Sequence, residues 1–337
     1  MRKSFVPRSY LLATVLLVAV TMFPSGAIAA SPETPNPLQV AILRWYPVNT
    51  ASLQFPVGTS PIGVAFDGAN IWVANSGSST VTKLQANTGA VLGTFQVGTG
   101  PAGVAFDGAN IWVANFGDST VSKLRASTGA VLGTFPAGPN PNGIAFDGAD
   151  IWVPNYSSNT VTKLQASTGR VLGTFSVGAV PNSIAFDGAN IWVTSYEGDT
   201  VMKLQASTGA VLGTFLVGTT PSAVAFDGTN IWVTNLFSRN VTKLLASTGA
   251  LLGTFPVGYE PWGLAFDGVN VWVANYGGST VTKLLATTGQ VLGTFPAGSY
   301  PRGVAFDGAN IWVADYASST VSKMEWRTVL YAFLGEV

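Results

Sequence analysis

The 337-residue chain contains no cysteine and no histidine. The first absence excludes disulfides, thiol nucleophiles and thiolate metal sites, and the second removes the commonest general base and the imidazole ligands of zinc. Charged residues are also scarce, at 9% against the usual quarter for a soluble domain. Acidic and basic residues balance at 16 each, so neither a nucleic-acid nor a polyphosphate partner is indicated.

The first 29 residues are expected to serve in sorting and not in folding. Three basic residues precede an apolar run over residues 11–20, which is too short to span a bilayer. The small residues Ala27 and Ala29 follow, as at the end of a secretory signal peptide. We therefore predict a signal peptide over residues 1–29 and a secreted or periplasmic protein with no membrane insertion after cleavage. An uncleaved membrane anchor is the alternative.

Residues 30–50 are assigned to a linker before the folded part of the chain. Residues 30–38 contain three prolines, which favour an extended backbone. A further edge strand is predicted over residues 39–45. Residues 51–337 then make up the folded domain.

That domain repeats itself every 40 residues without an insertion. Each of seven units contains Ala-Phe-Asp-Gly followed by Ile/Val-Trp-Val, and six units end in Thr-Gly-x-x-Leu-Gly-Thr-Phe. A fixed period of this size is the mark of a solenoid or a propeller. The units begin at Pro61, Pro101, Pro141, Pro181, Pro221, Pro261 and Pro301.

The turn residues decide between these two architectures. In the first unit, β-rich runs over residues 63–66, 70–74, 80–85 and 91–97 are separated by turns such as Asp67-Gly68, and no helical period exceeds one turn. Four short antiparallel strands per unit make one propeller blade. The sequence therefore predicts an all-β, seven-bladed β-propeller.

The two ends of the repeat are expected to close the ring. Residues 52–58 match the fourth-strand tail, with Phe55 in the place of Phe95, and the last unit lacks this tail. An N-terminal strand that completes the last blade leaves no exposed inner edge. Residues 329–334 are predicted to cap the same blade.

The segments Phe-Asp-Gly-Ala-Asn-Ile-Trp-Val-Ala-Asn and Ser-Thr-Val-Thr-Lys-Leu resemble YVTN-type and NHL-type repeats of bacterial β-propellers, over residues 51–326. This resemblance implies a binding or scaffolding module. A more distant similarity to the virginiamycin B lyase propeller implies chemistry based on histidine and magnesium, which a chain without histidine cannot take over. Gluconolactonase-like propellers bind a metal through acidic and Asn side chains, and no such isolated set stands out here.

Three residue types recur at fixed positions in every blade. The Asp is expected to bond its own turn, with a cation site of oxygen ligands as the alternative. The Trp is expected to pack between blades. The Lys is expected to be an exposed stem with its charge in water, with an anion-binding belt as the alternative. These residues are Asp67, Asp107, Asp147, Asp187, Asp227, Asp267 and Asp307; Trp72, Trp112, Trp152, Trp192, Trp232, Trp272 and Trp312; and Lys83, Lys123, Lys163, Lys203, Lys243, Lys283 and Lys323.

Two connections in each unit hardly vary, and the other two differ from unit to unit. Alternate loops of an antiparallel meander fall on the same side, so the varied loops share one face, which we call the variable face. The opposite side is the constant face. Loops on a rigid scaffold are the usual location for recognition, although drift without function also produces variation.

The candidate ligand-binding residues lie on the variable face. Aromatic and arginine side chains are typical anchors of binding sites. A first cluster from adjacent blades consists of Tyr259, Glu260, Trp262, Tyr300 and Arg302. A second, more polar cluster consists of Glu197, Asp199 and Arg239. Recurring aromatic residues are expected to pack beside their blades, namely Phe116, Tyr156, Tyr196, Tyr276 and Tyr316.

The sequence thus favours a non-catalytic, extracytoplasmic binding or scaffold propeller that recognises a protein, peptide or glycan through its variable face. No nucleophile–base pair or phosphate loop is apparent, so no catalytic residue, cofactor or metal is predicted. A monomer is expected. The alternatives are a metal-dependent enzyme of lyase or lactonase type and a purely structural envelope protein.

Overall fold

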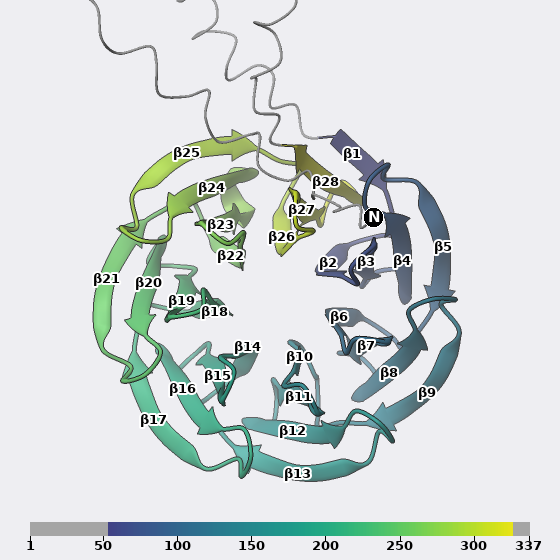
Figure 1. Cartoon of the computed structure of the whole chain (residues 1–337), viewed down its shortest axis with the longest axis horizontal. Coiled ribbons are helices and arrows are strands. Elements are labelled where there is room, and N and C mark those ends of the chain that lie inside the picture. The colour runs from purple at the N-terminus through teal and green to yellow at the C-terminus, as the bar shows by residue number, and fades with distance from the viewer. Residues whose placement is uncertain (1–52, 326–337) are drawn as a thin grey trace, which may run out of the picture. The chain divides into compact units, whose positions relative to one another are not determined.

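The computed structural model describes residues 53–325. The predicted signal peptide and linker, and the segments over 39–45 and 329–334, lie outside the described residues. Within them, seven four-stranded antiparallel sheets stand in a ring (Figure 1). The predicted all-β, seven-bladed β-propeller is therefore confirmed. No helix in residues 53–325 combines the length and hydropathy that a membrane crossing requires.

Blades 1 to 4 follow one another along the chain, each with its first strand at the centre of the ring and its fourth at the rim (Figure 1). Blade by blade, their strands are β2 (Pro61–Phe66), β3 (Asn70–Asn75), β4 (Thr80–Gln85) and β5 (Val91–Gln96); β6 (Pro101–Phe106), β7 (Asn110–Asn115), β8 (Thr120–Arg125) and β9 (Val131–Pro136); β10 (Ala145–Phe146), β11 (Asp150–Asn155), β12 (Thr160–Gln165) and β13 (Val171–Ser176); and β14 (Pro181–Phe186), β15 (Asn190–Ser195), β16 (Thr200–Gln205) and β17 (Val211–Leu216).

Blades 5 to 7 repeat this arrangement, and a short 3-10 helix, η1 (Tyr276–Gly278), connects two strands of blade 6. Their strands are β18 (Pro221–Phe226), β19 (Asn230–Asn235), β20 (Asn240–Leu245) and β21 (Leu251–Pro256); β22 (Pro261–Phe266), β23 (Asn270–Asn275), β24 (Thr280–Leu285) and β25 (Val291–Pro296); and β26 (Pro301–Phe306), β27 (Asn310–Asp315), β28 (Thr320–Glu325) and β1 (Leu53–Pro56).

Blade 3 has an inner strand of only two residues, β10. Its neighbour β11 carries Pro154 where the other blades have Ala or Thr. Proline has no amide hydrogen to donate to a strand ladder, so regular pairing begins only at Ala145. An isolated bridge between Pro141 and Asn155 keeps the start of the segment in place.

The ring closes as the sequence predicts. Strand β1 pairs antiparallel with β28 and supplies the fourth strand of blade 7, with Phe55 opposite Val321. The Phe55 and Trp312 ring centroids are 5.6 Å apart, much like those of Phe95 and Trp72 in blade 1, at 5.7 Å. An N-terminal strand thus reproduces a contact that the other blades make within their own sequence.

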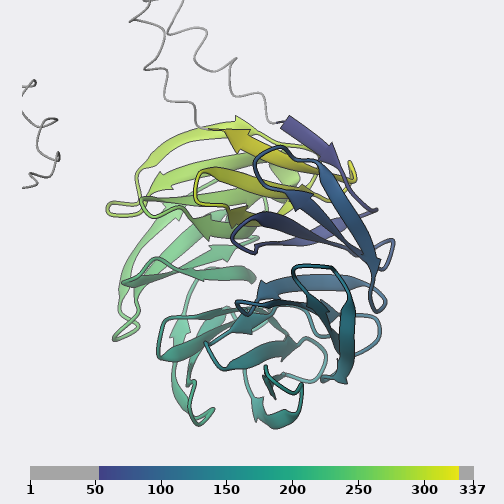
Figure 2. The ribbon, with the colours of Figure 1, turned by 45° about the vertical axis from the view of Figure 1, so that its right-hand side comes forward.

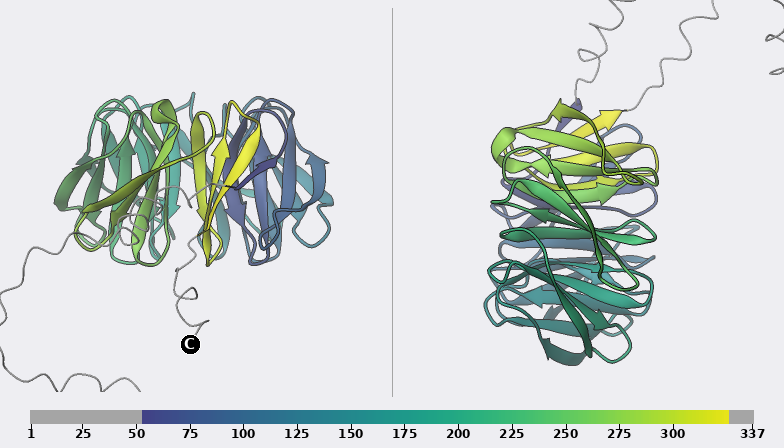
Figure 3. Two further views of the ribbon diagram at one scale, coloured as in Figure 1. Left: turned by 90° about the horizontal axis from the view of Figure 1, so that it is seen from above. Right: turned by 90° about the vertical axis from the view of Figure 1, so that its left-hand side faces the viewer.

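The hydrophobic core lies between the blades, which stand face to face around the ring (Figures 2 and 3). Trp72 and Val81 of blade 1, for example, pack with Ile111 and Val113 of blade 2. All seven blade tryptophans are fully buried, and each removes roughly 150–250 Å² from water. The prediction that they form an inter-blade core is confirmed.

The recurring Asp holds the turn between the first two strands of its blade. In blade 1, Oδ1 of Asp67 accepts hydrogen bonds from the backbone amides of Ala69 (2.9 Å) and Asn70 (2.6 Å), while Oδ2 accepts one from the Trp72 indole (2.8 Å). Burial would raise the pKa of Asp67, but these donors hold it below its usual value. The predicted turn role is confirmed, and the same carboxylate also satisfies a buried indole.

The recurring Lys is buried in six blades, and Lys283 is half-buried, so the prediction of an exposed stem is wrong. Lys83 is only 7% exposed, and its ammonium donates to the backbone carbonyl of Ala126 in blade 2 at 2.7 Å. It also lies over the Trp72 ring of its own blade, 5.2 Å from the centroid. An ammonium is tolerated here because a carbonyl acceptor and an indole face replace its hydration.

The same bond to the next blade recurs around the ring. Lys323 closes the circle by donating to the Asn87 carbonyl of blade 1 at 3.2 Å. All seven ammonium groups lie 4.9 to 5.5 Å from the Trp centroid of their own blade. The other donor and acceptor pairs are Lys123 with Ala166, Lys163 with Ala206, Lys203 with Ala246 and Lys243 with Ala286.

Replacing one blade lysine tests whether this bond stabilises the ring. Lys203→Met leaves the buried Ala246 carbonyl without its charged donor and removes the cation from the Trp192 ring. We expect the free energy of unfolding in urea to fall by about 1.5–3 kcal/mol. Arg125→Gln, at an exposed strand end where other blades carry Gln, is the control and should change little. Equal stability of the two variants would contradict the assigned role.

Candidate functional site

The two varied connections of each blade lie together on one face. Where they meet, the Ser76 amide donates to the Ser60 carbonyl and the Gly77 amide to the Thr59 carbonyl, both at 3.0 Å. Figure 3 shows the ring from the side, with the connections on two opposite faces. The variable face is therefore a set of paired loops, two from each blade.

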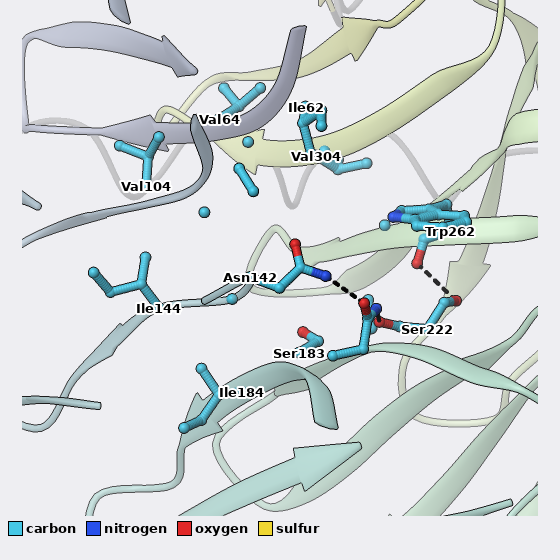
Figure 4. Close-up of a pocket in the computed structure, with 18 of the residues that line it drawn as sticks. Ile62, Val64, Val104, Asn142, Ile144, Ser183, Ile184, Ser222, Trp262 and Val304 are labelled. Carbon is cyan, nitrogen blue, oxygen red and sulfur yellow. Dashed lines mark hydrogen bonds between the residues drawn. The ribbon is translucent and has the colours of Figure 1, made fainter. Parts of the chain in front are cut away.

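A channel of about 250 Å³ runs between the innermost strands (Figure 4). Each of these strands starts just after a varied connection, so its second residue lies nearer the variable face than its fourth. The fourth residues are all aliphatic, and we call them the aliphatic ring: Val64, Val104, Ile144, Ile184, Val224, Leu264 and Val304. The second residues differ from blade to blade; six of them line the channel, namely Ile62, Ala102, Asn142, Asn182, Ser222 and Trp262, and the seventh is Arg302.

Close approach of the inner strands accounts for the glycine that most blades carry directly after the second residue. A Cβ atom on Gly263 would lie 2.0 Å from the Arg302 carbonyl oxygen of the next blade. A side chain there would force blades 6 and 7 apart, and with them the residues at the mouth of the channel.

A chain of hydrogen bonds links the second residues of blades 3 to 5, which we call the polar arc. The Asn142 amide donates to the side-chain oxygen of Asn182, whose own amide donates to the Ser222 carbonyl at 2.5 Å. The Ser222 hydroxyl lies within hydrogen-bond distance of the Trp262 carbonyl at 3.1 Å (Figure 4) and of the Pro261 carbonyl at 2.8 Å. This arc was not predicted from the sequence, although the variation at the second strand residue was a signal for it.

Beside Trp262, which lines the channel, the Arg302 guanidinium lies among three aromatic rings. Its central carbon is 4.4 Å from the centroid of Trp262, 4.3 Å from that of Tyr316 and 5.2 Å from that of Tyr276. Tyr300 packs on Tyr276, with centroids 4.8 Å apart. Trp262, Tyr300 and Arg302 of the first predicted cluster are thus brought together, and Tyr276 and Tyr316 join them.

The recurring aromatic residues continue this group across the face. Ring contacts at 6.5, 6.4 and 5.8 Å connect Trp262 to Tyr196, Tyr196 to Tyr156 and Tyr156 to Phe116. They pack against one another between blades, whereas the sequence suggested packing beside each blade. We call the half-buried rings Phe116, Tyr156, Tyr196, Trp262, Tyr276 and Tyr316 the aromatic arc.

Two other predicted residues pair away from this group. Tyr259 is 55% exposed and lies under the Arg239 guanidinium, 3.7 Å from the ring centroid to the central carbon. Arg239 of the second predicted cluster therefore joins Tyr259 of the first.

The three predicted acids serve different purposes. Asp199 accepts a hydrogen bond from the Thr220 amide at 2.8 Å and so supports a loop. The Glu260 carbonyl accepts one from the Tyr276 amide at 2.9 Å, and the Glu260 carboxylate lies over Gly277. Glu197 is exposed.

The charge at the mouth of the channel is positive and unpaired. No acid in residues 53–325 forms an ion pair with Arg302, and its buried Nε atom has no hydrogen-bond partner among them. Burial raises the pKa of the nearby Tyr196, and the charge of Tyr156 adds to this while Arg302 opposes it. No group of three or more acidic residues in the described part of the chain could hold a metal ion.

One buried carboxyl group lies apart from the mouth. Asp315 is fully buried and accepts hydrogen bonds from the Ser322 hydroxyl (2.6 Å) and the Gly298 amide (3.0 Å). Burial raises its pKa to about 6, although these donors oppose the rise. Blade 2 carries Asn115 at this position, with its amide donating to Thr120 and Ser122.

Asp315→Asn is therefore expected to stabilise the protein at neutral pH. Between about pH 4 and 6 the folded state holds a proton on Asp315 that the unfolded state has lost, so wild-type stability falls as the pH rises through this range. Asparagine removes that fall and raises the free energy of unfolding at pH 7 by up to about 3 kcal/mol. Urea titrations at several pH values measure the difference in free energy of unfolding between wild type and Asp315→Asn.

The reciprocal substitution is the matched control for this prediction. Asn115→Asp places a carboxyl group in the equivalent site of blade 2, beside a Thr and a Ser hydroxyl like those of Thr320 and Ser322 at Asp315. It should create a second loss of stability over the same pH range. A wild-type protein whose stability does not fall from pH 4 to 6 relative to Asp315→Asn would show that the buried carboxyl is not the cause.

Comparison with known proteins shows relatives in fold but not in sequence. No family model matches the chain, and no curated protein does. A Kuenenia stuttgartiensis hydrazine synthase structure superimposes with a TM-score of 0.72 at 19% identity, covering 80% of this chain and 97% of that one. Catalytically inactive virginiamycin B lyase from Staphylococcus aureus with quinupristin gives 0.71 at 17% identity, covering 82% and 99%. A streptogramin B lyase gives 0.69 at 16%, covering 82% and 97%.

These identities are low, so the likeness establishes a shared propeller fold and leaves the activity open. The chain is thus a seven-bladed β-propeller similar in architecture to virginiamycin B lyase.

Proposed function

We propose that this chain is a non-catalytic binding propeller that takes its ligand at the mouth of the channel on the variable face. The supporting observation is that Arg302 and the aromatic arc gather at this mouth, half-buried and with an unpaired positive charge. Aromatic residues and arginine are the side chains that most often anchor ligands. A secreted or periplasmic setting is part of the proposal and depends on the signal peptide predicted over residues 1–29.

The Asp and Lys side chains that recur in the blades have structural roles within the fold. The blade carboxylates bond turns and indoles, and the blade ammonium groups bond the next blade, so neither ring is available to a ligand. The residues that differ between blades, in the varied loops and at the second position of the inner strands, lie mainly at the end of the channel on the variable face. A structural part and a recognition part are therefore separated in space, which favours recognition over a purely structural role.

A lyase-type enzyme is the second candidate, because two structural neighbours are lyases. The virginiamycin B lyase was solved with quinupristin, so a propeller of similar architecture can hold an organic ligand. This chain, however, has no histidine, and its described residues contain no acidic metal cluster. Titration with Mg²⁺ or Ca²⁺ separates the candidates, since a stoichiometric site that raises the Tm would favour the enzyme.

Trp262→Ala tests the location of the binding site. We would screen wild-type protein against tripeptides and short oligosaccharides by thermal shift, and then measure each hit by calorimetry. Loss of the Trp262 ring should weaken binding by about tenfold or more, because the ring lines the channel and holds Arg302. Tyr259→Ala, in the exposed pair with Arg239, shows whether the ligand reaches further out.

Val269→Ala is the matched control on the constant face. Val269 is 59% exposed, and most other blades carry Ala at its position, so folding and binding should both be preserved. A hit that binds all three variants as tightly as wild type would place the site elsewhere. If no peptide or oligosaccharide raises the Tm, the binding proposal fails and the structural alternative gains support.

A further inference from the structure

We infer that the mouth of the channel is a carboxylate-recognition site that takes a small apolar carboxylate. The charged group pairs with Arg302, and the hydrocarbon part lies against the aliphatic ring. This inference rests on the proposed function and names the ligand class for the same site. Two kinds of ligand combine a carboxylate with an apolar group in this way: a free short-chain acyl carboxylate and the C-terminal residue of an apolar peptide.

The Arg302 guanidinium is incompletely satisfied within the described part of the chain. Arg302 has rings of Trp262, Tyr276 and Tyr316 within 4.3 to 5.2 Å, and such contacts involve the π-faces of the rings. They leave the N–H groups at the edge of the guanidinium in need of acceptors, and the buried Nε has none among the described residues. A carboxylate matches this edge with two parallel hydrogen bonds.

The acids of this chain do not fill that role. Glu260 adjoins the aromatic arc, because its carbonyl accepts a hydrogen bond from the Tyr276 amide, and Glu197 follows Tyr196 in the chain. Neither acid is paired with Arg302 in residues 53–325, and the Glu260 carboxylate lies over Gly277. An external anion therefore remains the natural partner of the guanidinium.

The channel below the mouth determines the size and polarity of the group that the carboxylate can carry. All seven members of the aliphatic ring line it together with the polar arc, and their side chains offer a hydrocarbon group an apolar contact. Its volume of about 250 Å³ lies below the roughly 300–1,000 Å³ of pockets for drug-sized molecules. One aliphatic side chain or a short acyl chain is the group that fits, with its acid group left at the mouth.

Calorimetric titration with three small probes tests this directly. N-acetyl-L-leucine represents a peptide C-terminus, hexanoate represents a free acyl carboxylate, and N-acetyl-L-leucine amide is the neutral match of the first. We expect at least one acid to bind wild-type protein, and the amide to bind about tenfold more weakly or worse than N-acetyl-L-leucine if that acid binds. Tighter binding of N-acetyl-L-leucine than of hexanoate would identify a peptide C-terminus as the source, and the reverse order a free acyl chain.

Arg302→Asn removes the charge with a residue that this strand position already tolerates, as Asn142 and Asn182 show in blades 3 and 4. The acids should bind this variant about tenfold more weakly or worse. The control is Arg239→Asn, which removes the other stacked guanidinium and matches Asn159 at the equivalent position of blade 3. Its affinity for the acids should be unchanged, and thermal melts would confirm that both variants fold.

The inference would be overturned if the amide bound as tightly as its acid, if Arg302→Asn bound the acids like wild type, or if neither acid bound wild-type protein at millimolar concentration. These outcomes remain distinct from failure of the proposed function. A peptide or oligosaccharide hit that depends on Trp262 would keep the binding site while excluding carboxylate recognition there. Absence of every hit would remove both.

Discussion

Buried lysines connect neighbouring sheets around the ring, and the geometry of the ring depends on this contact. The Lys83 ammonium reaches a carbonyl 43 residues further along the chain, on the neighbouring blade, and lies on its own blade's Trp72. Because the Trp72 indole is in turn bonded to Asp67, turn, core and blade interface share a single network. Repetition of this network fixes the spacing of the blades, and it brings the seven inner strands close enough to enclose a narrow channel.

Much of the fold could be predicted from the sequence, because a 40-residue period with Asp-Gly turns and β-branched runs allows few architectures. The closure by β1 was predictable too, since Phe55 stands where the tail motif has its phenylalanine. The burial of the lysines was not. Lysine usually extends its ammonium group into water. The carbonyl that accepts from Lys83 belongs to a different repeat, so no local sequence pattern indicates that this lysine is buried.

The site was predictable only in part, for a related reason. Comparison of the repeats singled out Trp262 and Arg302, because they differ from their counterparts in the other blades. It did not show that Tyr276 and Tyr316 would flank Arg302, or that Tyr259 would pair with Arg239 instead. Such contacts depend on how far neighbouring blades approach one another, and that distance is set by the packing of whole sheets.

The central claim is that the channel mouth on the variable face holds an apolar carboxylate above the aliphatic ring. Methyl NMR spectra of Ile-, Leu- and Val-labelled protein, recorded as N-acetyl-L-leucine or hexanoate is added, test it most directly. The account predicts shifts in the channel methyl groups, such as those of Val64, Ile144 and Ile184, and none in the exposed Val91 and Leu92 at the rim. Shifts at the rim with an unchanged channel, or no shifts with either acid, would contradict it.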